Sequence, residues 1–149
     1  MLFRYYLIIF AGKKMSTRIL IALGSNHEQE KNVAFAMERL RSFFPGISFS
    51  RILWTEPIGI ASDRFVNALA LADMDREQEE VERILKQIEK ECGRSREEKM
   101  RNIIRLDLDL LQWGTVRLRE QDWKRDYIRL LLQGDAMGIL IISQTYREL

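Results

Sequence analysis

Hydrophobic and polar positions in the first third of the chain follow a strand spacing and then a helix spacing. Residues 18–23 form a short apolar run ended by Gly-Ser-Asn, which is typical of a strand buried on both faces. From Val33 to Phe44 apolar side chains recur every three or four residues, which predicts an amphipathic helix. A Pro-Gly pair ends this helix, and the alternation in residues 47–54 predicts a second strand.

The next part of the chain predicts a second strand–helix–strand series. After a loop at residues 55–64, residues 65–72 predict a third strand. An apolar stripe over residues 81–92 predicts a second helix, which Gly93 ends, and residues 106–111 predict a fourth strand. The order β-α-β-β-α-β favours an α+β fold, a ferredoxin-like sandwich in which two helices cover one face of a four-stranded antiparallel sheet.

Composition narrows the functional class. A chain of 149 residues suggests one domain with a substantial core. The formal charge of +2 does not indicate a general nucleic-acid surface, and the basic run at residues 99–105 carries no interleaved aromatic platform for RNA. A lone cysteine, Cys92, excludes an internal disulfide and fits a reducing, cytoplasmic compartment. The sequence does not indicate an oligomeric state.

The N-terminal segment differs from the rest. Residues 3–11 are apolar but too few to span a bilayer, so no membrane association is expected. A signal peptide remains an alternative, although the segment lacks a small-residue cleavage site. The favoured interpretation is that residues 1–14 are a non-native or disordered extension and that residues 15–149 form a single domain.

Two aspartates on the last predicted strand are the main chemical feature. Asp107 and Asp109 are two residues apart, so on a strand both carboxylates project from the same side. Adjacent carboxylates repel unless a cation lies between them, and Mg²⁺ with nucleotide phosphates is a usual occupant. Five basic residues just upstream are candidates for phosphate contacts: Arg94, Arg96, Lys99, Arg101 and Arg105. The pattern indicates metal-assisted phosphoryl transfer. Two alternatives remain: the aspartates can be solvent-exposed polar residues on a sheet edge, and Arg96 can belong to a solvated basic loop.

Four segments in this order resemble the 6-hydroxymethyl-7,8-dihydropterin pyrophosphokinase family over about residues 19–132. The segments are IALGSN at 21–26, TEPIG at 55–59 with FVNA at 65–68, IEKECGRSR at 88–96 and RLDLDLL at 105–111. The resemblance implies an ATP-dependent diphosphotransferase of folate biosynthesis. Members transfer diphosphate from ATP to the pterin hydroxymethyl group and release AMP, so the implied partners are a small pterin, ATP and Mg²⁺.

The resemblance also implies roles for individual residues. Metal ligands with a catalytic role would be Asp107 and Asp109, with Arg94 as a third catalytic residue beside the phosphates. The implied pterin pocket comprises Thr55, Ile58, Phe65, Asn67 and Tyr127. The implied nucleotide contacts are Glu89, Arg96 and Arg125.

The strand pattern adds to the pterin assignment. Phe65 and Asn67 share one strand face, where a buried amide needs partners that a pterin edge supplies and an aromatic face suits its ring. Ser25 and Asn26 are equally compatible with a structural turn and with substrate contact.

The chain departs from the family pattern in its basic loop. Residues 101–104 read Arg-Asn-Ile-Ile where the family has Trp-Gly-Pro-Arg, so Ile104 replaces a phosphate-clamping arginine. Arg105 is a candidate substitute. A Pro-His segment and the family's usual tail are missing, and residues 133–149 have no assigned role. A second hypothesis is therefore a catalytically weak or inactive paralogue that acts as a ligand-binding or interaction protein.

Overall fold

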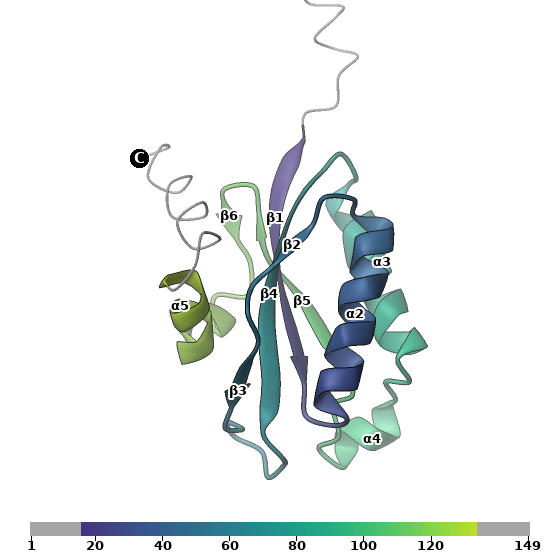
Figure 1. The fold of residues 1–149 in the computed structure, drawn as a ribbon, viewed down its shortest axis with the longest axis vertical. Helices are drawn as coiled ribbons and strands as arrows, with labels where there is room; N and C mark the ends of the chain where they lie inside the picture. The colour runs from purple at the N-terminus through teal and green to yellow at the C-terminus, as the bar shows by residue number, and fades with distance from the viewer. Residues whose placement is uncertain (1–15, 134–149) are drawn as a thin grey trace, which may run out of the picture.

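An antiparallel sheet forms the centre of the computed structural model, which describes residues 16–133 (Figure 1). The strands follow the order β2-β4-β1-β5-β6, and β3 also pairs with β4. All pairs are antiparallel, and β1 is flanked by β4 and β5. The strands are β1 (Thr17–Ser25), β2 (Ser48–Phe49), β3 (Leu53–Thr55), β4 (Phe65–Met74), β5 (Asp107–Trp113) and β6 (Val116–Arg117).

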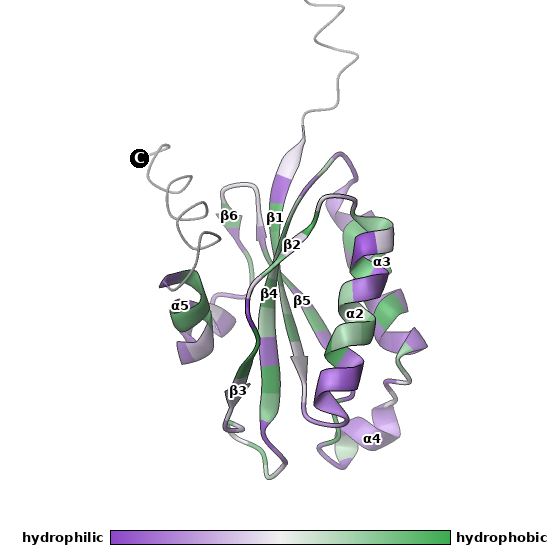
Figure 2. Cartoon of the chain, viewed as in Figure 1, coloured by the Kyte–Doolittle hydropathy of each residue, from purple (hydrophilic) through white to green (hydrophobic). Residues whose placement is uncertain are grey.

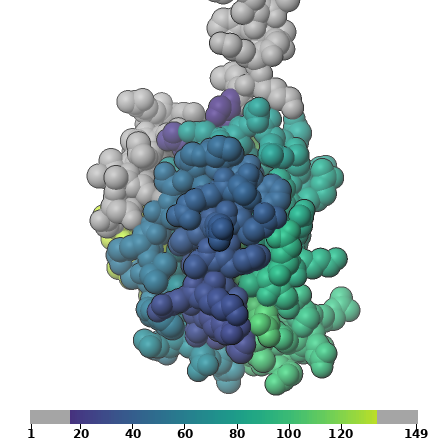
Figure 3. Space-filling view, turned by 45° about the vertical axis from the view of Figure 1, so that its right-hand side comes forward, coloured from purple at the N-terminus to yellow at the C-terminus, as the bar shows by residue number. Residues whose placement is uncertain are grey.

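Helices lie on both faces of this sheet. The two long helices pack on one face, whereas the C-terminal helix of the described residues packs on the other (Figure 1). In the space-filling view, residues of α2 and its neighbours cover the face turned to the viewer (Figure 3). The helices are α2 (Gln29–Phe43), α3 (Gln78–Glu91), the short α4 (Arg96–Met100), the 3-10 turn η1 (Asp122–Lys124) and α5 (Asp126–Gln133).

Two apolar layers follow from the alternation of side chains along β1. Ile19, Ile21 and Leu23 belong to the layer beneath α2 and α3. Leu20 and Ala22 belong to a smaller layer on the other face, which includes Ile128 and Leu131 of α5. Strand β4 and helix α5 are coloured mainly as hydrophobic, whereas α4 is mainly hydrophilic (Figure 2). The α5 layer is the smaller of the two, and a cavity lies on this face of the sheet.

Strand β5 contributes to both layers by alternation and contains a bulge. Its pairing with β1 shifts between Leu110, opposite Ile21, and Gln112, opposite Leu20. Leu111 is the extra residue and packs in the α5 layer, whereas Leu110 packs beneath the long helices. The bulge begins after Asp109, so the strand keeps regular alternation at the two aspartates.

The prediction of an α+β fold with an antiparallel sheet is confirmed, but the prediction of four strands is wrong. The described sheet has six strands, so the ferredoxin-like detail is not confirmed. Placement of the helices on one face holds for α2 and α3 only, because α5 lies on the other face.

The strand expected at residues 47–54 is divided into β2 and β3. Four steps from Phe49 to Leu53 oppose three steps from Ala70 to Asn67 on β4, which leaves one extra residue. At this point Ser50 Oγ accepts a hydrogen bond from the Leu69 N–H at 2.8 Å, so a side chain replaces part of the regular ladder.

The expected extension at residues 1–14 lies outside the described residues, and so does nearly all of the unassigned segment 133–149. Among the described residues, no helix combines the length and the apolar character needed to cross a membrane.

Candidate active site

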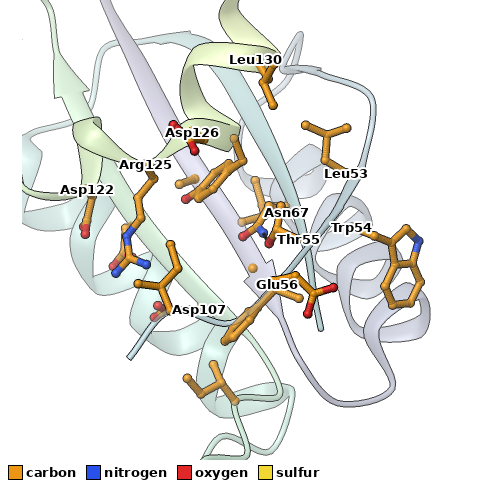
Figure 4. Close-up of a pocket in the computed structure, with 18 of the residues that line it drawn as sticks. Leu53, Trp54, Thr55, Glu56, Asn67, Asp107, Asp122, Arg125, Asp126 and Leu130 are labelled. Atoms are coloured by element: carbon orange, nitrogen blue, oxygen red, sulfur yellow. Dashed lines mark hydrogen bonds between the residues drawn. The ribbon is translucent and has the colours of Figure 1, made fainter. Parts of the chain in front are cut away.

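A cavity of about 570 Å³ opens on the α5 face of the sheet (Figure 4). Its walls come from β3 with the following loop, from the first residues of β4 and β5, and from the start of α5. Figure 4 shows Asn67 and Thr55 side by side, with Asp107, Asp122 and Arg125 grouped on one side of them. Eight of the residues singled out from the sequence line this cavity: Thr55, Ile58, Phe65, Asn67, Asp107, Asp109, Arg125 and Tyr127.

The cavity floor is formed by small residues of β1. Ala22 lies opposite Asp109, and Gly24 lies between Asp107 on β5 and Asn67 on β4. Cross-strand partners face the same side of a sheet, so the carboxylates and the amide rise on either side of this floor. A Cβ on Gly24 would lie 3.1 Å from Asn67 Oδ1, so glycine leaves room for the amide and for a ligand on the strand.

A hydrogen-bonded polar pair lies among the apolar walls. Asn67 is 6% exposed, and its Nδ2 donates to Thr55 Oγ1 at 2.5 Å. The remaining groups of this pair can contact a ligand that enters the cavity. Apolar side chains also line the cavity, and the sequence analysis missed three of them: Leu53, Ile60 and Leu130. Apolar walls with a few fixed polar groups are typical of sites for flat organic ligands.

The two aspartates of β5 both line the cavity, with Asp109 the more buried. Burial, together with the negative charge of Asp107, raises the pKa of Asp109 to about 7. Arg119 opposes this shift, with its Nη2 3.5 Å from Asp109 Oδ1. Two repelling carboxylates in one cavity are a donor set that favours a hard divalent cation.

The two aspartates of β5 supply a pair of carboxylates for a metal ion in this cavity, which fits the way Mg²⁺ commonly binds. The described residues contain no group of three or more His, Cys, Asp or Glu side chains placed to hold a metal ion. Mg²⁺ commonly binds proteins through one or two carboxylates and completes its coordination with water and substrate phosphates. Asp107 and Asp109 supply that number of carboxylates, so the remaining ligands would have to come from solvent and substrate.

Arg94 connects the end of α3 to the start of β5. Its Nη1 donates to Asp107 Oδ1 at 2.7 Å and also to Glu89 Oε2. Glu89 is 2% exposed, and burial raises its pKa despite the adjacent guanidinium. Its other oxygen has no hydrogen-bond partner within the described part of the chain, and Lys86 Nζ lies 3.6 Å away. Arg94 therefore orients Asp107 and neutralises a buried carboxylate.

A second, more open hollow of about 790 Å³ lies on the other side of this contact. It is lined by Glu89 and Arg94 and by exposed or partly exposed basic residues of α3 and α4: Arg83, Lys86, Lys90, Arg96 and Lys99. Glu89 is the single acidic residue on its wall. The Arg94–Asp107 contact links the two hollows, so Glu89, Arg94 and Arg96 lie beside the cavity without lining it. The concentration of positive charge suits phosphate groups.

The basic loop is attached to β1 by Asn26. The Asn26 side chain accepts from the Ile104 N–H at 2.7 Å and donates to the Asn102 carbonyl at 2.8 Å. Asn26 is 4% exposed, so of the two alternatives for this residue the structure favours the structural one. Arg105 forms hydrogen bonds with Glu98 at 2.6 and 2.9 Å and does not line the cavity.

The raised pKa of Asp109 makes stability pH-dependent. Between its unfolded pKa near 3.8 and its folded pKa of about 7, the folded state binds the extra proton, so stability falls as pH rises. In EDTA, Asp109→Asn should therefore gain on the order of 2 kcal/mol over the original chain at pH 8, and much less at pH 5. Urea unfolding at both pH values measures this. Parallel pH profiles of the two proteins would contradict the assignment.

Comparison with known proteins identifies the family of this chain. No curated protein matches the chain significantly. A family model for 7,8-dihydro-6-hydroxymethylpterin-pyrophosphokinase (HPPK) matches residues 20–134, well over half of the chain. That range includes β4 and β5, most of β1, both long helices and every lining residue described above. The chain therefore belongs to the HPPK family.

Proposed function

We propose that this chain transfers the diphosphate of ATP to the hydroxyl of 6-hydroxymethyl-7,8-dihydropterin and releases AMP. The observation that carries the proposal is the shared cavity, in which a carboxylate pair lies across a glycine from a buried amide. Family membership supports a pyrophosphokinase of folate synthesis. The cavity supports the proposal further, because its apolar wall suits a flat ring and its carboxylate pair suits a metal-bound phosphate chain.

The pterin ring is assigned to the wall that includes Thr55 and Asn67. The amide and hydroxyl can exchange hydrogen bonds with the edge of the ring, while Phe65, Ile58 and Tyr127 provide apolar contact. Burial raises the pKa of the Tyr127 phenol, so this side chain stays neutral. A neutral phenol beside the carboxylates can donate a hydrogen bond without adding charge.

Mg²⁺ is assigned to Asp107 and Asp109. When bound, it would neutralise negative charge that develops on the phosphate oxygens during transfer. Arg94 holds Asp107 in one orientation through the 2.7 Å hydrogen bond and thereby contributes to catalysis. In the transfer, the pterin hydroxyl oxygen bonds to the β-phosphorus of ATP as the bond from that phosphorus to the AMP oxygen breaks, and the hydroxyl proton is released.

The nucleotide is assigned to the basic side of the site. Arg125 contributes a guanidinium inside the cavity, and Arg96 and Glu89 border the hollow beyond the Arg94–Asp107 contact. Departure from the family pattern weakens this region, because Ile104 lines the cavity where the family pattern has an arginine. Arg105 does not replace it, since Glu98 engages its guanidinium.

We therefore expect pterin to bind more tightly than nucleotide. A lost arginine–phosphate contact removes about 1.5–3 kcal/mol, or about one to two powers of ten in affinity. Calorimetry with a non-hydrolysable ATP analogue and Mg²⁺, compared with a pterin titration, measures the order. Ile104→Arg should tighten nucleotide binding and leave pterin binding unchanged. Tight nucleotide binding without pterin binding would contradict the proposal and indicate another nucleotide-dependent function.

The departure of residues 101–104 from the family pattern also supports the second candidate, a ligand-binding paralogue with little or no turnover. Ile104 and the engaged Arg105 leave the phosphate chain with fewer cationic contacts than the family pattern provides, whereas the amide wall is intact. Pterin binding without AMP formation at saturating Mg²⁺ and ATP would favour this candidate.

A further inference from the structure

Arg119 is the basic residue that approaches the deeper aspartate of the carboxylate pair. Its Nη2 lies 3.5 Å from Asp109 Oδ1, and its Nε donates to Asp122 Oδ2 at 2.6 Å. The residue lies outside the four segments that carry the resemblance, and its backbone adopts a left-handed conformation with φ of 55°. Residues other than glycine seldom adopt this backbone conformation. At Arg119 it occurs where the guanidinium lies between two carboxylates.

The charge balance around Asp109 gives Arg119 a specific consequence. Asp107 and Asp122 place negative charge near Asp109, and Arg119 is the cation that favours its ionised form. Arg94 is engaged by Glu89 and Asp107. A divalent cation at Asp109 would compensate the same charge that Arg119 compensates. Two cations that compensate one carboxylate repel each other, so they compete.

We propose that Arg119 is an internal counter-ion that competes with the divalent cation for Asp109 and lowers the affinity of the site for that cation on its own. This inference rests on the proposed function, because it takes Asp107 and Asp109 as the metal ligands. A site with weakened affinity for the free cation binds it mainly together with phosphate oxygens, which supply further negative charge. Arg119 acts through Asp109 in this way and makes binding of the metal depend on binding of the nucleotide.

The test is a titration of the full chain with Mn²⁺ alone, in which the spectrum of free Mn²⁺ is followed by electron paramagnetic resonance. Arg119→Gln should bind Mn²⁺ about five-fold more tightly than the original chain, because the substitution removes one positively charged side chain beside the metal ligands. Arg119→Lys keeps the charge and should stay within about two-fold. The matched control is Arg117→Gln, because Arg117 stacks on Trp123 at 4.2 Å and forms no ion pair with either aspartate.

The outcomes distinguish a failure of this inference from a failure of the function on which it rests. Mn²⁺ binding that is lost in Asp109→Asn and tightened in Arg119→Gln supports both. Binding that is lost in Asp109→Asn but unchanged or weakened in Arg119→Gln overturns the role of Arg119 and leaves the metal site in place. Binding that is the same in Asp109→Asn and the original chain overturns both. Unfolding curves of each variant establish that the compared proteins are folded.

Discussion

Asp109→Ala is expected to lower AMP formation by about a hundred-fold or more while the protein stays folded. The expected loss follows from the role assigned to the carboxylate, since metal-based charge stabilisation contributes several kcal/mol to such transfers. Folding should not suffer, because burial and the adjacent Asp107 make the ionised carboxylate unfavourable. The measurement is AMP release with saturating Mg²⁺, ATP and pterin, accompanied by a thermal unfolding curve.

Asp126→Ala is the control for that experiment. Asp126 lines the same cavity, but its side chain is 88% exposed and its ion pair is with Arg129 at 3.7 Å. Its removal should change AMP formation by less than about two-fold, as is usual for an exposed pair. Equal losses in the two variants would show that negative charge around the cavity matters in general, and would contradict a specific role for Asp109.

Arg94→Ala should have the largest effect on stability, on the order of 3 kcal/mol. It leaves Glu89, which is 2% exposed, without its guanidinium partner, and a buried carboxylate that loses its cation is costly. Urea denaturation gives the free energy of unfolding. The double variant Arg94→Ala with Glu89→Gln should recover most of the loss, because it removes the buried charge as well.

The matched control for Arg94 is Arg96→Ala. Arg96 borders the same basic hollow two residues away, but it is exposed. Its removal should change the free energy of unfolding by no more than about 0.5 kcal/mol. If the two single variants were equally stable, or if Glu89→Gln gave no recovery, the pair with Glu89 would not be the structural contact described above.

Local periodicity predicted the parts of the fold in which each residue follows a regular spacing. Leu106, Leu108 and Leu110 share one face of the chain around β5, so the two intervening aspartates had to share the other. The bulge at Leu111 and the division at Ser50 had no comparable signal, because both depend on partners far away in the sequence. Helix α5 was missed because it has only eight residues, so its apolar spacing, with Ile128 and Leu131 on the buried face, spans barely two turns.

The sequence predicted those residues of the candidate site that belong to the segments resembling the family. Thr55 and Asn67 were grouped by the resemblance, and the structure adds their hydrogen bond and the glycine floor beside them. Sequence alone did not reveal that Arg94 is shared between Glu89 and Asp107, because that geometry requires α3 and β5 to be packed together. Arg119 gave no signal at all, since its proximity to Asp109 depends on the turn that follows β6.

The most direct test of the proposed function is a discontinuous assay for AMP. The full chain is incubated with ATP, Mg²⁺ and 6-hydroxymethyl-7,8-dihydropterin, and the nucleotide products are separated by chromatography. We predict that AMP and diphosphorylated pterin appear in equal amounts, that neither forms without the pterin, and that both fall by about a hundred-fold or more with Asp109→Ala. Formation of ADP in place of AMP, or no AMP at saturating substrates from a chain that binds the pterin, would contradict a pterin diphosphokinase.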